Sequence, residues 1–543
     1  MTTVFDTLEL APPAYDFTRK EDYEAEFDAI TGYSFDRKTA HRVRFATGTD
    51  SYKLSHPDQY PDGTEYVLAN ITPRTTRVEG LDKAVLFGLQ AFLVEWTGDA
   101  FQDFLNTPED LAMAAIAYRY ASLVGEQPNL VERFRALHRL GYLPLEFRGL
   151  PEGSIVPMRV PMITVENTHP EFFWLPNFVE SVLSAELWHP ITSASQARRL
   201  RALFDSWAER TGGAPEFVDF QGHDFSFRGL EGRDAAAKSG AAHLTSFKGS
   251  DNLPGLDMVD AFYPSAAGRT ANGLIASSPP ATEHAVMCAG GKLDELLTYR
   301  RLLGIYPKGI LSIVSDTWDL WHVVTVILPA LKDEIMARDG KLVIRPDSGD
   351  PVDIICGDPT APAGSPAHLG LARLLAAEFG AIPNAKGYLE LDPHIGMIYG
   401  DSITYDRADQ MCARLEAIGF ASTNIVLGIG SFTYQFVTRD TLGIAMKTTW
   451  AQVWGEGHNL SKDPVTDRDK DGVSIKKSAT GRLAVARNEG GELTLIEEAT
   501  PEQEAASLLR PIFRDGRFLA TQSFGDVRAL LEAQRDVPGL LAA

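Results

Sequence analysis

Short apolar runs followed by polar loops recur through the middle of the chain. The instances are "AHLTSFKGSDN", "GILSIVSDTWDLW", "KLVIRPDSGDP", "HIGMIYGDSITYD" and "NIVLGIGSFTYQ", and amphipathic stretches lie between them. Continuous runs of Val, Ile and Leu are typical of strands buried on both faces of a parallel sheet, and their alternation with helices indicates βαβ units. We therefore predict an α/β fold with either a parallel βα barrel or a doubly wound sheet.

A different pattern precedes this region. The segment "PLEFRGLPEGSIVPMRVPMITVENTHP" reads as short strands interrupted by Pro and Gly, which favours an antiparallel β layer. It is followed by "EFFWLPNFVESVLSAELW" and "SQARRLRALFDSWAER", whose apolar spacing predicts two helices, with Ser195 as the N-cap of the second. Residues 1–43 are acidic and weakly periodic, so we expect an extension with a short helix around Lys20 to Ile30.

Composition limits the class of protein. The 543 residues are 44% hydrophobic and 23% charged, and no apolar run reaches the about eighteen residues of a membrane span, so we expect a soluble protein. The first residues lack the features of a secretory signal, which makes the cytoplasm the expected compartment. A formal net charge of −22 disfavours nucleic acid as a partner. Cys288, Cys356 and Cys412 form no CxxC pair, so no disulfide framework or thiolate zinc site is predicted.

Polar side chains follow the predicted strands. Arg345 and Asp347 in "IRPDSGDP" come directly after the strand Leu342 to Ile344. An Arg fork suits a phosphate, and a nearby carboxylate suits a sugar hydroxyl or a metal-bound water; the alternative is a structural ion pair. Ligands of both sheet architectures bind at the carboxyl ends of the strands, so this edge of the sheet is where we expect the site.

Three further strand ends carry candidates. Asp401 follows Gly400 in "IYGDSITYD", and Asp316 lies in "SDTWD", where Ser315 or Asp316 alternatively caps the next helix. The glycines of "LGIGSF", Gly428 and Gly430, allow a phosphate or ribose to approach the backbone.

The stretch "SSPPATEHAVMC" presents His284 among small residues and next to Glu283. An imidazole becomes a nucleophile when one nitrogen is free and the other is held, and Glu283 or Asp316 could hold it. The alternative is a hydrogen-bonded core histidine.

In combination, the motifs resemble those of the nicotinamide phosphoribosyltransferases, over roughly Thr47 to Phe524. The matching motifs are "TDSYKLSH", "QYP", "GLPEGSIVP", "ITVENTHPEFFWL", "HDFSFRG", "FKGSDN", "EH", "SIVSDTWD", "IRPDSGDP", "GDSI", "TRD" and "KDP". The resemblance implies a type II phosphoribosyltransferase fold, with a parallel βα barrel beside a β-rich domain built from N- and C-terminal segments. It further implies a homodimer with shared active sites that transfers phosphoribosyl from phosphoribosyl pyrophosphate (PRPP) to nicotinamide, giving nicotinamide mononucleotide and pyrophosphate for NAD salvage.

The resemblance also implies roles for individual residues. Asp347 matches a ribose-side acid and Arg345 a guanidinium near the nicotinamide and the pyrophosphate, while Phe225 and the partner subunit's Tyr52 match the rings that sandwich the pyridine. Asp251 would accept a hydrogen bond from the carboxamide and repel the carboxylate of nicotinate. The full set of implied substrate contacts is Asp50, Tyr52, Arg74, Phe225, Arg228, Asp251, Ser278, Ser312, Asp401, Gly430 and Arg439.

His284 matches the histidine that this family phosphorylates with ATP. The implied basic residues around the ATP phosphates are Lys447, Lys462 and Lys470. Mg²⁺ is expected through the pyrophosphate, without direct protein ligands. The family's glycine-rich loop departs from its pattern here, because Ser431 and Phe432 replace glycines.

The resulting domain prediction has four parts. Residues 1–43 form an N-terminal extension, 44–185 the N-terminal part of the β-rich domain with a linking helix, 186–450 the barrel, and 451–543 a C-terminal return to the β-rich domain.

Three rival functions remain open. A nicotinate phosphoribosyltransferase shares the fold and the phosphohistidine. A catalytically silent protein that binds NAD metabolites would be expected to lack His284, Arg345 or Asp347, all of which are present. A barrel lyase or isomerase for a sugar phosphate would explain Arg345 and the acids but not the pyridine sandwich.

Overall fold

The computed structural model describes residues 37–265, 272–462, 466 and 478–535. The chain divides into two compact units, one formed by residues 1–59 and 95–143 and the other by residues 60–94 and 144–543. The helix expected around Lys20 to Ile30 lies outside the described residues.

The first unit is helical in its described part and has an aromatic core. The ring of Phe45 lies 4.9 Å from that of Phe101, and Phe104 lies 6.1 Å from Phe134. The hydroxyl of buried Tyr120 donates a hydrogen bond to the Ala46 carbonyl at 2.7 Å. The helices are α2 (Arg37–Arg42), α3 (Arg44–Thr47), η2 (Ser51–Asp58), η3 (Leu93–Ala100, which begins in the second unit), α5 (Phe101–Asn106), α6 (Glu109–Val124) and α7 (Pro128–Leu140).

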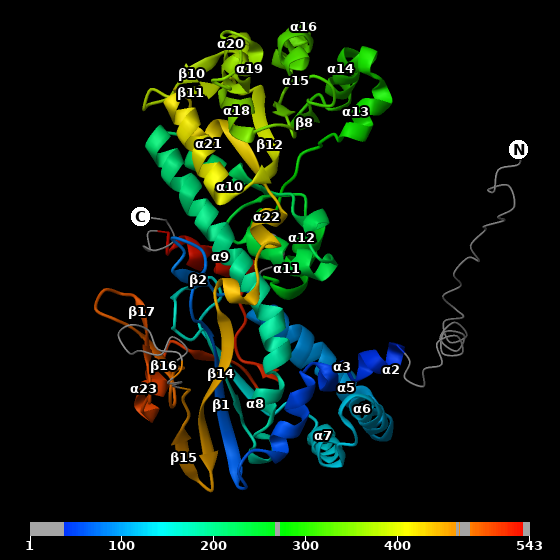
Figure 1. The fold of residues 1–543 in the computed structure, drawn as a ribbon, viewed down its shortest axis with the longest axis vertical. Coiled ribbons are helices and arrows are strands. Elements are labelled where there is room, and N and C mark those ends of the chain that lie inside the picture. The colour runs from blue at the N-terminus through cyan, green and yellow to red at the C-terminus, as the bar shows by residue number, and fades with distance from the viewer. Residues whose placement is uncertain (1–36, 266–271, 463–465, 467–477, 536–543) are drawn as a thin grey trace, which may run out of the picture. The chain divides into compact units, whose positions relative to one another are not determined.

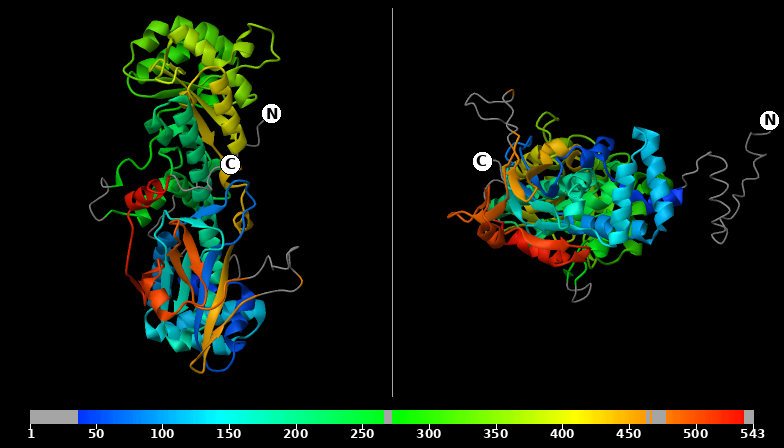
Figure 2. Two further views of the ribbon diagram at one scale, coloured as in Figure 1. Left: turned by 90° about the vertical axis from the view of Figure 1, so that its left-hand side faces the viewer. Right: turned by 90° about the horizontal axis from the view of Figure 1, so that it is seen from below.

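The second unit contains a seven-stranded antiparallel sheet made from both ends of the chain. Its order is β15 (Glu456–Asn459), β14 (Ile444–Val453), β1 (Thr64–Pro73), β5 (Ile163–Asn167), β3 (Leu145–Gly149), β18 (Arg510–Arg514) and β19 (Arg517–Phe518). Figures 1 and 2 show early strand β1, in blue, beside late strand β14, in orange. The β-rich domain expected from N- and C-terminal segments is therefore confirmed. Three two-stranded sheets pair β2 (Lys83–Val85) with β4 (Ile155–Pro157), β10 (Ala381–Pro383) with β11 (Leu389–Leu391), and β16 (Ala484–Arg487) with β17 (Leu493–Ile496).

The same unit contains a six-stranded parallel sheet. Its order is β7 (Gly249–Ser250), β6 (Gly222–Asp224), β13 (Ile425–Ile429), β12 (Ile395–Ile403), β9 (Leu342–Arg345) and β8 (Leu311–Val314). Residues 277–282, here called the closing segment, pair in parallel with both edges, through Gly249 with Ser277 and through Ala281 with Ser312. The pairings thus form a closed ring, and of the two architectures considered the chain has the barrel.

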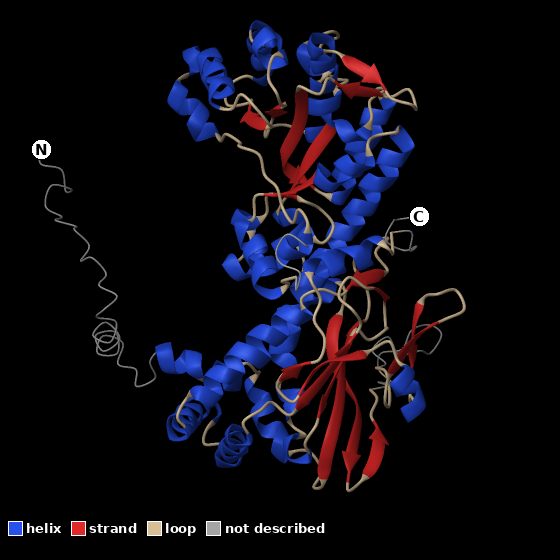
Figure 3. Ribbon diagram, turned by 180° about the vertical axis from the view of Figure 1, so that it is seen from behind, coloured by secondary structure: helices blue, strands red, loops and turns tan. Residues whose placement is uncertain are grey.

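Side chains alternate between the two faces of these short strands, as the pleat requires. Leu311 and Ile313 of β8, and Leu342 and Ile344 of β9, belong to the hydrophobic core shared with the surrounding helices. Their neighbours Ser312 and Val343 instead line a cavity inside the ring. Figure 3 shows the helices that surround these short strands.

The helices of the second unit precede, connect and follow its strands. They are α4 (Leu89–Phe92), η4 (Pro170–Phe172), α8 (Leu175–Phe178), α9 (Glu180–Thr211), α10 (Pro215–Gln221), η5 (Phe227–Gly229), α11 (Arg233–Leu244), α12 (Leu253–Phe262), α13 (His284–Gly290), η7 (Lys292–Asp294), α14 (Glu295–Ile305), α15 (Leu320–His322), η8 (Val323–Ile327), α16 (Leu328–Ala330), α17 (Lys332–Met336), α18 (Pro351–Cys356), α19 (Pro366–Leu369), α20 (Leu371–Phe379), α21 (Tyr405–Ala417), η9 (Ser422–Asn424), α22 (Ser431–Tyr434), η10 (Arg439–Thr441), α23 (Pro501–Ala506) and α24 (Phe524–Glu532). Within the described ranges, no helix combines the length and the apolar character needed to cross a bilayer.

The prediction of two helices with Ser195 as an N-cap is wrong. The first segment contains the short helix α8 and the start of α9, and α9 then continues from Glu180 without a break through Pro190 and the whole second segment. The Ser195 hydroxyl donates to the Ile191 carbonyl at 2.6 Å and accepts from the Val85 N–H at 2.8 Å. Burial against β2 therefore outweighs the local preference of serine for a helix start. The predicted limits at residues 185/186 and 450/451 fall inside α9 and β14.

Arg528 ties α24 to the barrel. Its guanidinium donates to four backbone carbonyls, those of Leu244, Leu274, Phe247 and Ile275, at 2.6–3.1 Å. Burial lowers the pKa of Arg528 to about 10, although Asp219 opposes this. The C-terminal segment is thus fastened by one side chain that satisfies several carbonyls at once.

We expect Arg528→Ala to lower the free energy of unfolding by about 2–4 kcal/mol, because buried carbonyls lose their donors. Urea unfolding followed by circular dichroism measures this. The control is Arg300→Ala, which removes an ion pair to Glu334 between half-exposed side chains (46% and 42%) and should cost less than about 1 kcal/mol. Equal losses in the two variants would contradict the role given to Arg528.

Candidate functional site

The carboxyl ends of the parallel strands bring most of the predicted site residues to one rim. β6 leads to Phe225, β7 to Asp251, β8 to Asp316 and β9 to Asp347, while β12 carries Asp401 and β13 leads to Gly430. The closing segment leads directly to Glu283 and His284. Since all these strands are parallel, their ends meet on the same side of the ring, as expected for a barrel enzyme.

His284 is the first residue of α13, and its side chain is 47% exposed. Its Nδ1 lies 3.0 Å from Thr317 Oγ1, while its Nε2 lies 3.9 Å from Asp316 Oδ1 and 3.9 Å from Asp347 Oδ2. Glu283 is exposed and precedes the helix without capping it through its side chain. A threonine hydroxyl thus holds the imidazole by a hydrogen bond, where the sequence suggested the acid of Glu283 or Asp316.

Asp347 stands among four other charged groups. Burial raises the pKa of Asp347; Arg345 and His284 oppose this change, whereas Asp316 and Asp401 increase it. Asp316 is nearly buried, and its Oδ2 accepts the Asp347 backbone N–H at 2.9 Å. A positive charge that approaches Asp347 would therefore stabilise its ionised carboxylate.

Arg345 is anchored by the closing segment. Its guanidinium donates to the Thr282 carbonyl at 2.6 Å, and its Nε lies 3.7 Å from Asp347 Oδ2. That Nε is buried and makes no hydrogen bond among the described residues. The predicted pairing of Arg345 and Asp347 is thus present, with the guanidinium fixed from one side.

A second group of side chains centres on Asp251. His223 Nε2 lies 2.8 Å from Asp251 Oδ1, and the Ser278 hydroxyl donates to the same oxygen. The ring of Phe225 lies 4.7 Å from that of His223. Residues from β6, from the end of β7 and from the closing segment therefore meet at one place.

Two glycines make room for these side chains. A Cβ at Gly400 would lie 2.6 Å from Asp347 Oδ1, and a Cβ at Gly428 would lie 2.5 Å from the Phe225 ring. The prediction that a phosphate or ribose approaches the backbone at Gly428 is wrong, because Phe225 packs against this glycine. Around Gly430, by contrast, a Cβ would meet no atom within 4 Å.

A cavity of about 440 Å³ extends from this group into the barrel. At one end it is lined by Phe225, Asp251 and Arg345, which follow or end their strands, and at the other by Lys341 and Asn424, which precede theirs. Ser312 lies in its wall and is 4% exposed. Most barrel interiors are filled by large side chains. Here the small residues Ala281, Ser312 and Gly396 line the cavity beside larger ones such as Val343, Ile398 and Val426.

Arg228, Arg439 and Asp401 are predicted site residues that do not line this cavity. Arg228 belongs to the exposed turn η5, whose Gly229 would meet Ser431 if it carried a Cβ. Arg439 opens η10 and lies 3.5 Å from Asp440. Asp401 is exposed and accepts a hydrogen bond from Ser402 at 2.9 Å.

The remaining predicted residues lie elsewhere. Asp50 and Tyr52 belong to the first unit, at the start of η2, and Tyr52 is 61% exposed. Arg74 directly follows β1, and Lys447 pairs with Asn70 across β1 and β14. Lys462 is exposed after β15, and Lys470 lies outside the described residues. Their predicted contacts with substrate or ATP stay predictions.

Sequence reasoning did not assign a role to Thr317, His223 or Thr282. Thr317 lies within the quoted "SDTWD" and His223 begins "HDFSFRG", so the motifs contained them without indicating their contacts. The expected cap of the helix after β8 is also corrected, because Asp319, not Ser315 or Asp316, accepts the first N–H groups of α15.

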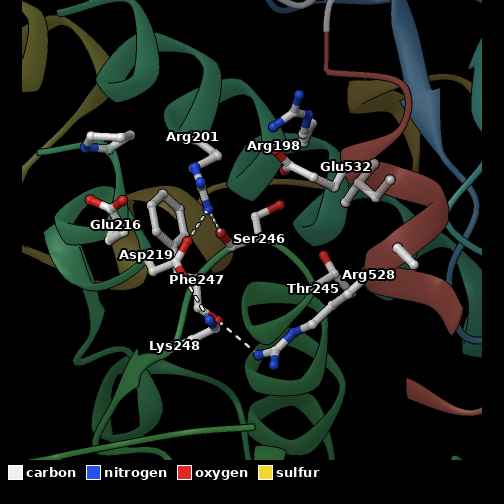
Figure 4. A pocket seen from close by; sticks show the side chains of 13 residues that line it. Arg198, Arg201, Glu216, Asp219, Thr245, Ser246, Phe247, Lys248, Arg528 and Glu532 are labelled. Carbon is white, nitrogen blue, oxygen red and sulfur yellow. Dashed lines mark hydrogen bonds and ion pairs between the residues drawn. The ribbon is translucent and has the colours of Figure 1, made fainter. Parts of the chain in front are cut away.

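A second cavity of about 440 Å³ lies outside the ring (Figure 4). Three of its charged side chains are paired with one another, because Asp219 contacts both Arg201 and Lys248, at 2.8 and 2.6 Å. Lys248 precedes β7, so this cavity lies at the amino side of the strand, away from the rim. It is therefore a less suitable candidate for the chemistry than the cavity beside Arg345 and Asp347.

Comparison with known proteins identifies the family of this chain. Residues 220–514 match the model of the nicotinate phosphoribosyltransferase (NAPRTase) family, and residues 44–111 match the nicotinamide phosphoribosyltransferase N-terminal domain. The chain is 46% identical to a nicotinamide phosphoribosyltransferase of Acinetobacter baylyi, over 91% of this chain and 98% of that protein. It is 34% identical to one of Mycoplasma pneumoniae, over 78% and 93%.

Among solved structures, a nicotinate-nucleotide pyrophosphorylase from Pyrococcus furiosus has a similar fold, with a TM-score of 0.51 at 14% identity over 90% of this chain and 95% of that chain. The family match covers just over half of this sequence, and the Acinetobacter baylyi relative covers 91% of it. The chain therefore belongs to the nicotinate phosphoribosyltransferase (NAPRTase) family of phosphoribosyltransferases.

Proposed function

We propose that this protein transfers the phosphoribosyl group of PRPP to nicotinamide, which yields nicotinamide mononucleotide and pyrophosphate for NAD salvage in the cytoplasm. The observation that carries the proposal is the position of Asp251 beside Phe225, at the same rim as Arg345, Asp347 and His284. The names of the relatives support the same choice of substrate.

The transfer requires opposite charges to be stabilised on the two sides of one bond. As the bond between the anomeric carbon and the pyrophosphate oxygen breaks, positive charge develops on the ribose and negative charge on the leaving group. Asp347 would face the ribose, because an approaching cation relieves the repulsion from Asp316 and Asp401. Arg345 would bind the pyrophosphate or the pyridine side.

The acidic rim fits a hydrated Mg²⁺ carried by the pyrophosphate. Asp316, Asp347 and Asp401 provide negative charge, while the described residues include no cluster of three such side chains close enough to hold an ion directly. Mg²⁺ commonly keeps several waters and binds substrate phosphates. When bound, it would supply charge neutralisation of the departing pyrophosphate.

Binding of the pyridine would combine stacking with one hydrogen bond. Phe225 offers a ring face, and stacking of this kind contributes about 0.5–1.5 kcal/mol beyond burial. In the proposed homodimer the partner subunit's Tyr52 covers the other face. Asp251 would accept the carboxamide NH₂, whereas a nicotinate carboxylate would meet a like charge, at a cost of several kcal/mol.

His284 would couple ATP to the transfer. In this step Nδ1–H would donate to Thr317 Oγ1, 3.0 Å away. Nε2 would keep its lone pair and attack the γ-phosphorus of ATP, so that an N–P bond forms while the bond to ADP breaks. Exposure of almost half of the side chain leaves space for the phosphoryl group. Lys447, Lys462 and Lys470 are the proposed cations around the ATP phosphates.

The first test is product detection by mass spectrometry, with PRPP, Mg²⁺ and either nicotinamide or nicotinate. We expect nicotinamide mononucleotide, with a kcat/KM for nicotinamide well above that for nicotinate because Asp251 repels the acid. A higher kcat/KM for nicotinate would favour the nicotinate-specific alternative. Binding of both pyridines without any product would favour a catalytically silent protein.

We expect His284→Ala to abolish the stimulation of this reaction by ATP, while some basal transfer remains, because the phosphoryl acceptor is lost. Initial rates with and without ATP measure the effect, and ³²P from γ-labelled ATP should no longer label the variant. Full stimulation in the variant would refute the phosphohistidine.

Gly428→Ala should raise the KM for nicotinamide about two- to tenfold, the equivalent of losing the stacking contribution, because the added methyl would lie 2.5 Å from the Phe225 ring and 2.8 Å from the Gly400 carbonyl oxygen and would displace both. The KM for PRPP should change less. The control is Gly304→Ala in α14, where a Cβ meets no atom within 4 Å. An unchanged KM for nicotinamide would show that the ring does not hold the pyridine.

A further inference from the structure

His223 is a buried histidine whose imidazole faces the cavity and contacts two residues of the proposed pyridine site. It is 6% exposed, and its Nε2 lies 2.8 Å from Asp251 Oδ1. Its ring lies 4.7 Å from the Phe225 ring and lines the same cavity. The imidazole thus connects the stacking ring with the carboxylate.

The backbone fixes where this imidazole lies. His223 pairs with Gly249 of β7 on one side and with Gly428 of β13 on the other. A Cβ at Gly249 would lie 2.8 Å from His223 Nδ1, so the glycine provides the space that the ring occupies. The ring therefore has a defined position, set by two neighbouring strands.

The contacts of Asp251 are unequal at its two oxygens. His223 Nε2–H and the Ser278 hydroxyl both donate to Oδ1. Within the described residues no hydrogen bond reaches Oδ2, which remains available as an acceptor. Two donors on one oxygen restrict the rotation of the carboxylate.

We propose that His223 is a positioning residue that sets the preference for a carboxamide over a carboxylate by holding Asp251 with Oδ2 turned toward the pyridine substituent. This inference rests on the proposed function. His223 would then contribute to substrate specificity without touching the reacting atoms.

The charge state of Asp251 supports the same role. Burial raises the pKa of Asp251, but the hydrogen bond and charge of His223, the Ser278 hydroxyl and Arg345 outweigh it, so the pKa lies below its usual value. The ionised carboxylate accepts from an amide NH₂ and repels nicotinate. Removal of His223 would leave the Asp251 carboxylate less well oriented and its ionised form less stabilised.

A purely structural histidine in the same unit provides the matched control. His189 is also 6% exposed, but its Nε2 contacts the Tyr434 carbonyl at 2.8 Å and it does not line the cavity. Loss of either imidazole removes a buried ring and one hydrogen bond. Only loss of His223 should change the choice between the two pyridines.

The test measures the ratio of kcat/KM for nicotinamide to kcat/KM for nicotinate in the full-length protein. We expect His223→Ala and His223→Asn to lower this ratio about tenfold or more, mainly through KM, because neither new side chain reaches Asp251. His223→Gln should keep most of the ratio, since its amide NH₂ occupies the place of Nε2–H. His189→Ala should leave the ratio unchanged.

The outcomes separate this inference from the proposed function. If Asp251→Asn lowers the ratio while both His223→Ala and His223→Asn preserve it, the role of His223 is refuted and the proposed function stands. An equal change in His189→Ala would also refute it. If the wild-type protein forms no nicotinamide mononucleotide, both proposals fail. If His223→Ala does not fold, comparison of the ratio in His223→Asn with that in His223→Gln tests the same role.

Discussion

The pairing of residues 277–282 with both edges of the parallel sheet is the constraint on which the site depends. The Ser277 N–H donates to the Lys248 carbonyl at 2.7 Å, and the Ser312 N–H donates to the Pro280 carbonyl at 2.9 Å. Pro279 and Pro280 have no N–H to contribute, so the donor on the β8 side is the Thr282 N–H, which bonds to the Ser312 carbonyl at 3.0 Å. Closure of the ring aligns its carboxyl end with those of the other strands and delivers His284 to the rim. The same segment supplies the Thr282 carbonyl that anchors Arg345 and the Ser278 hydroxyl that contacts Asp251.

The hollow interior follows from the size of the side chains that point inward. Leu311, Ile313, Leu342 and Ile344 belong to the core, whereas the small residues Ser312, Ala281 and Gly396 line the cavity together with larger ones such as Val343, Ile398 and Val426. Space inside the ring is then available to a flat heterocycle. At the rim, Gly400 and Gly428 also provide space because they lack side chains. Gly400 leaves room for Asp347, and Gly428 leaves room for Phe225.

The rim has two regions that differ in their electrostatic environment. Around Asp347, several carboxylates oppose one another and raise its pKa, an arrangement suited to a substrate that brings or develops positive charge. Around Asp251, an imidazole and a hydroxyl stabilise a single carboxylate and lower its pKa, an arrangement suited to a neutral hydrogen-bond donor. Arg345 lowers the pKa of both carboxylates, which links the two regions of the rim.

The amino-acid sequence by itself determined the parallel strands, the β-rich sheet and the identity of the polar residues at the strand ends. These properties depend on local periodicity and on residues that follow strands directly, as Asp347 follows Leu342 to Arg345. Tertiary structure decided which nitrogen of His284 is held and by what, that Ser195 lies inside a continuous helix, and that Gly428 faces a ring. Each of these depends on a partner far away in the chain, such as Thr317 for His284 or Val85 for Ser195. The spacing of residues along one strand cannot predict such partners, because folding brings them together from distant parts of the chain.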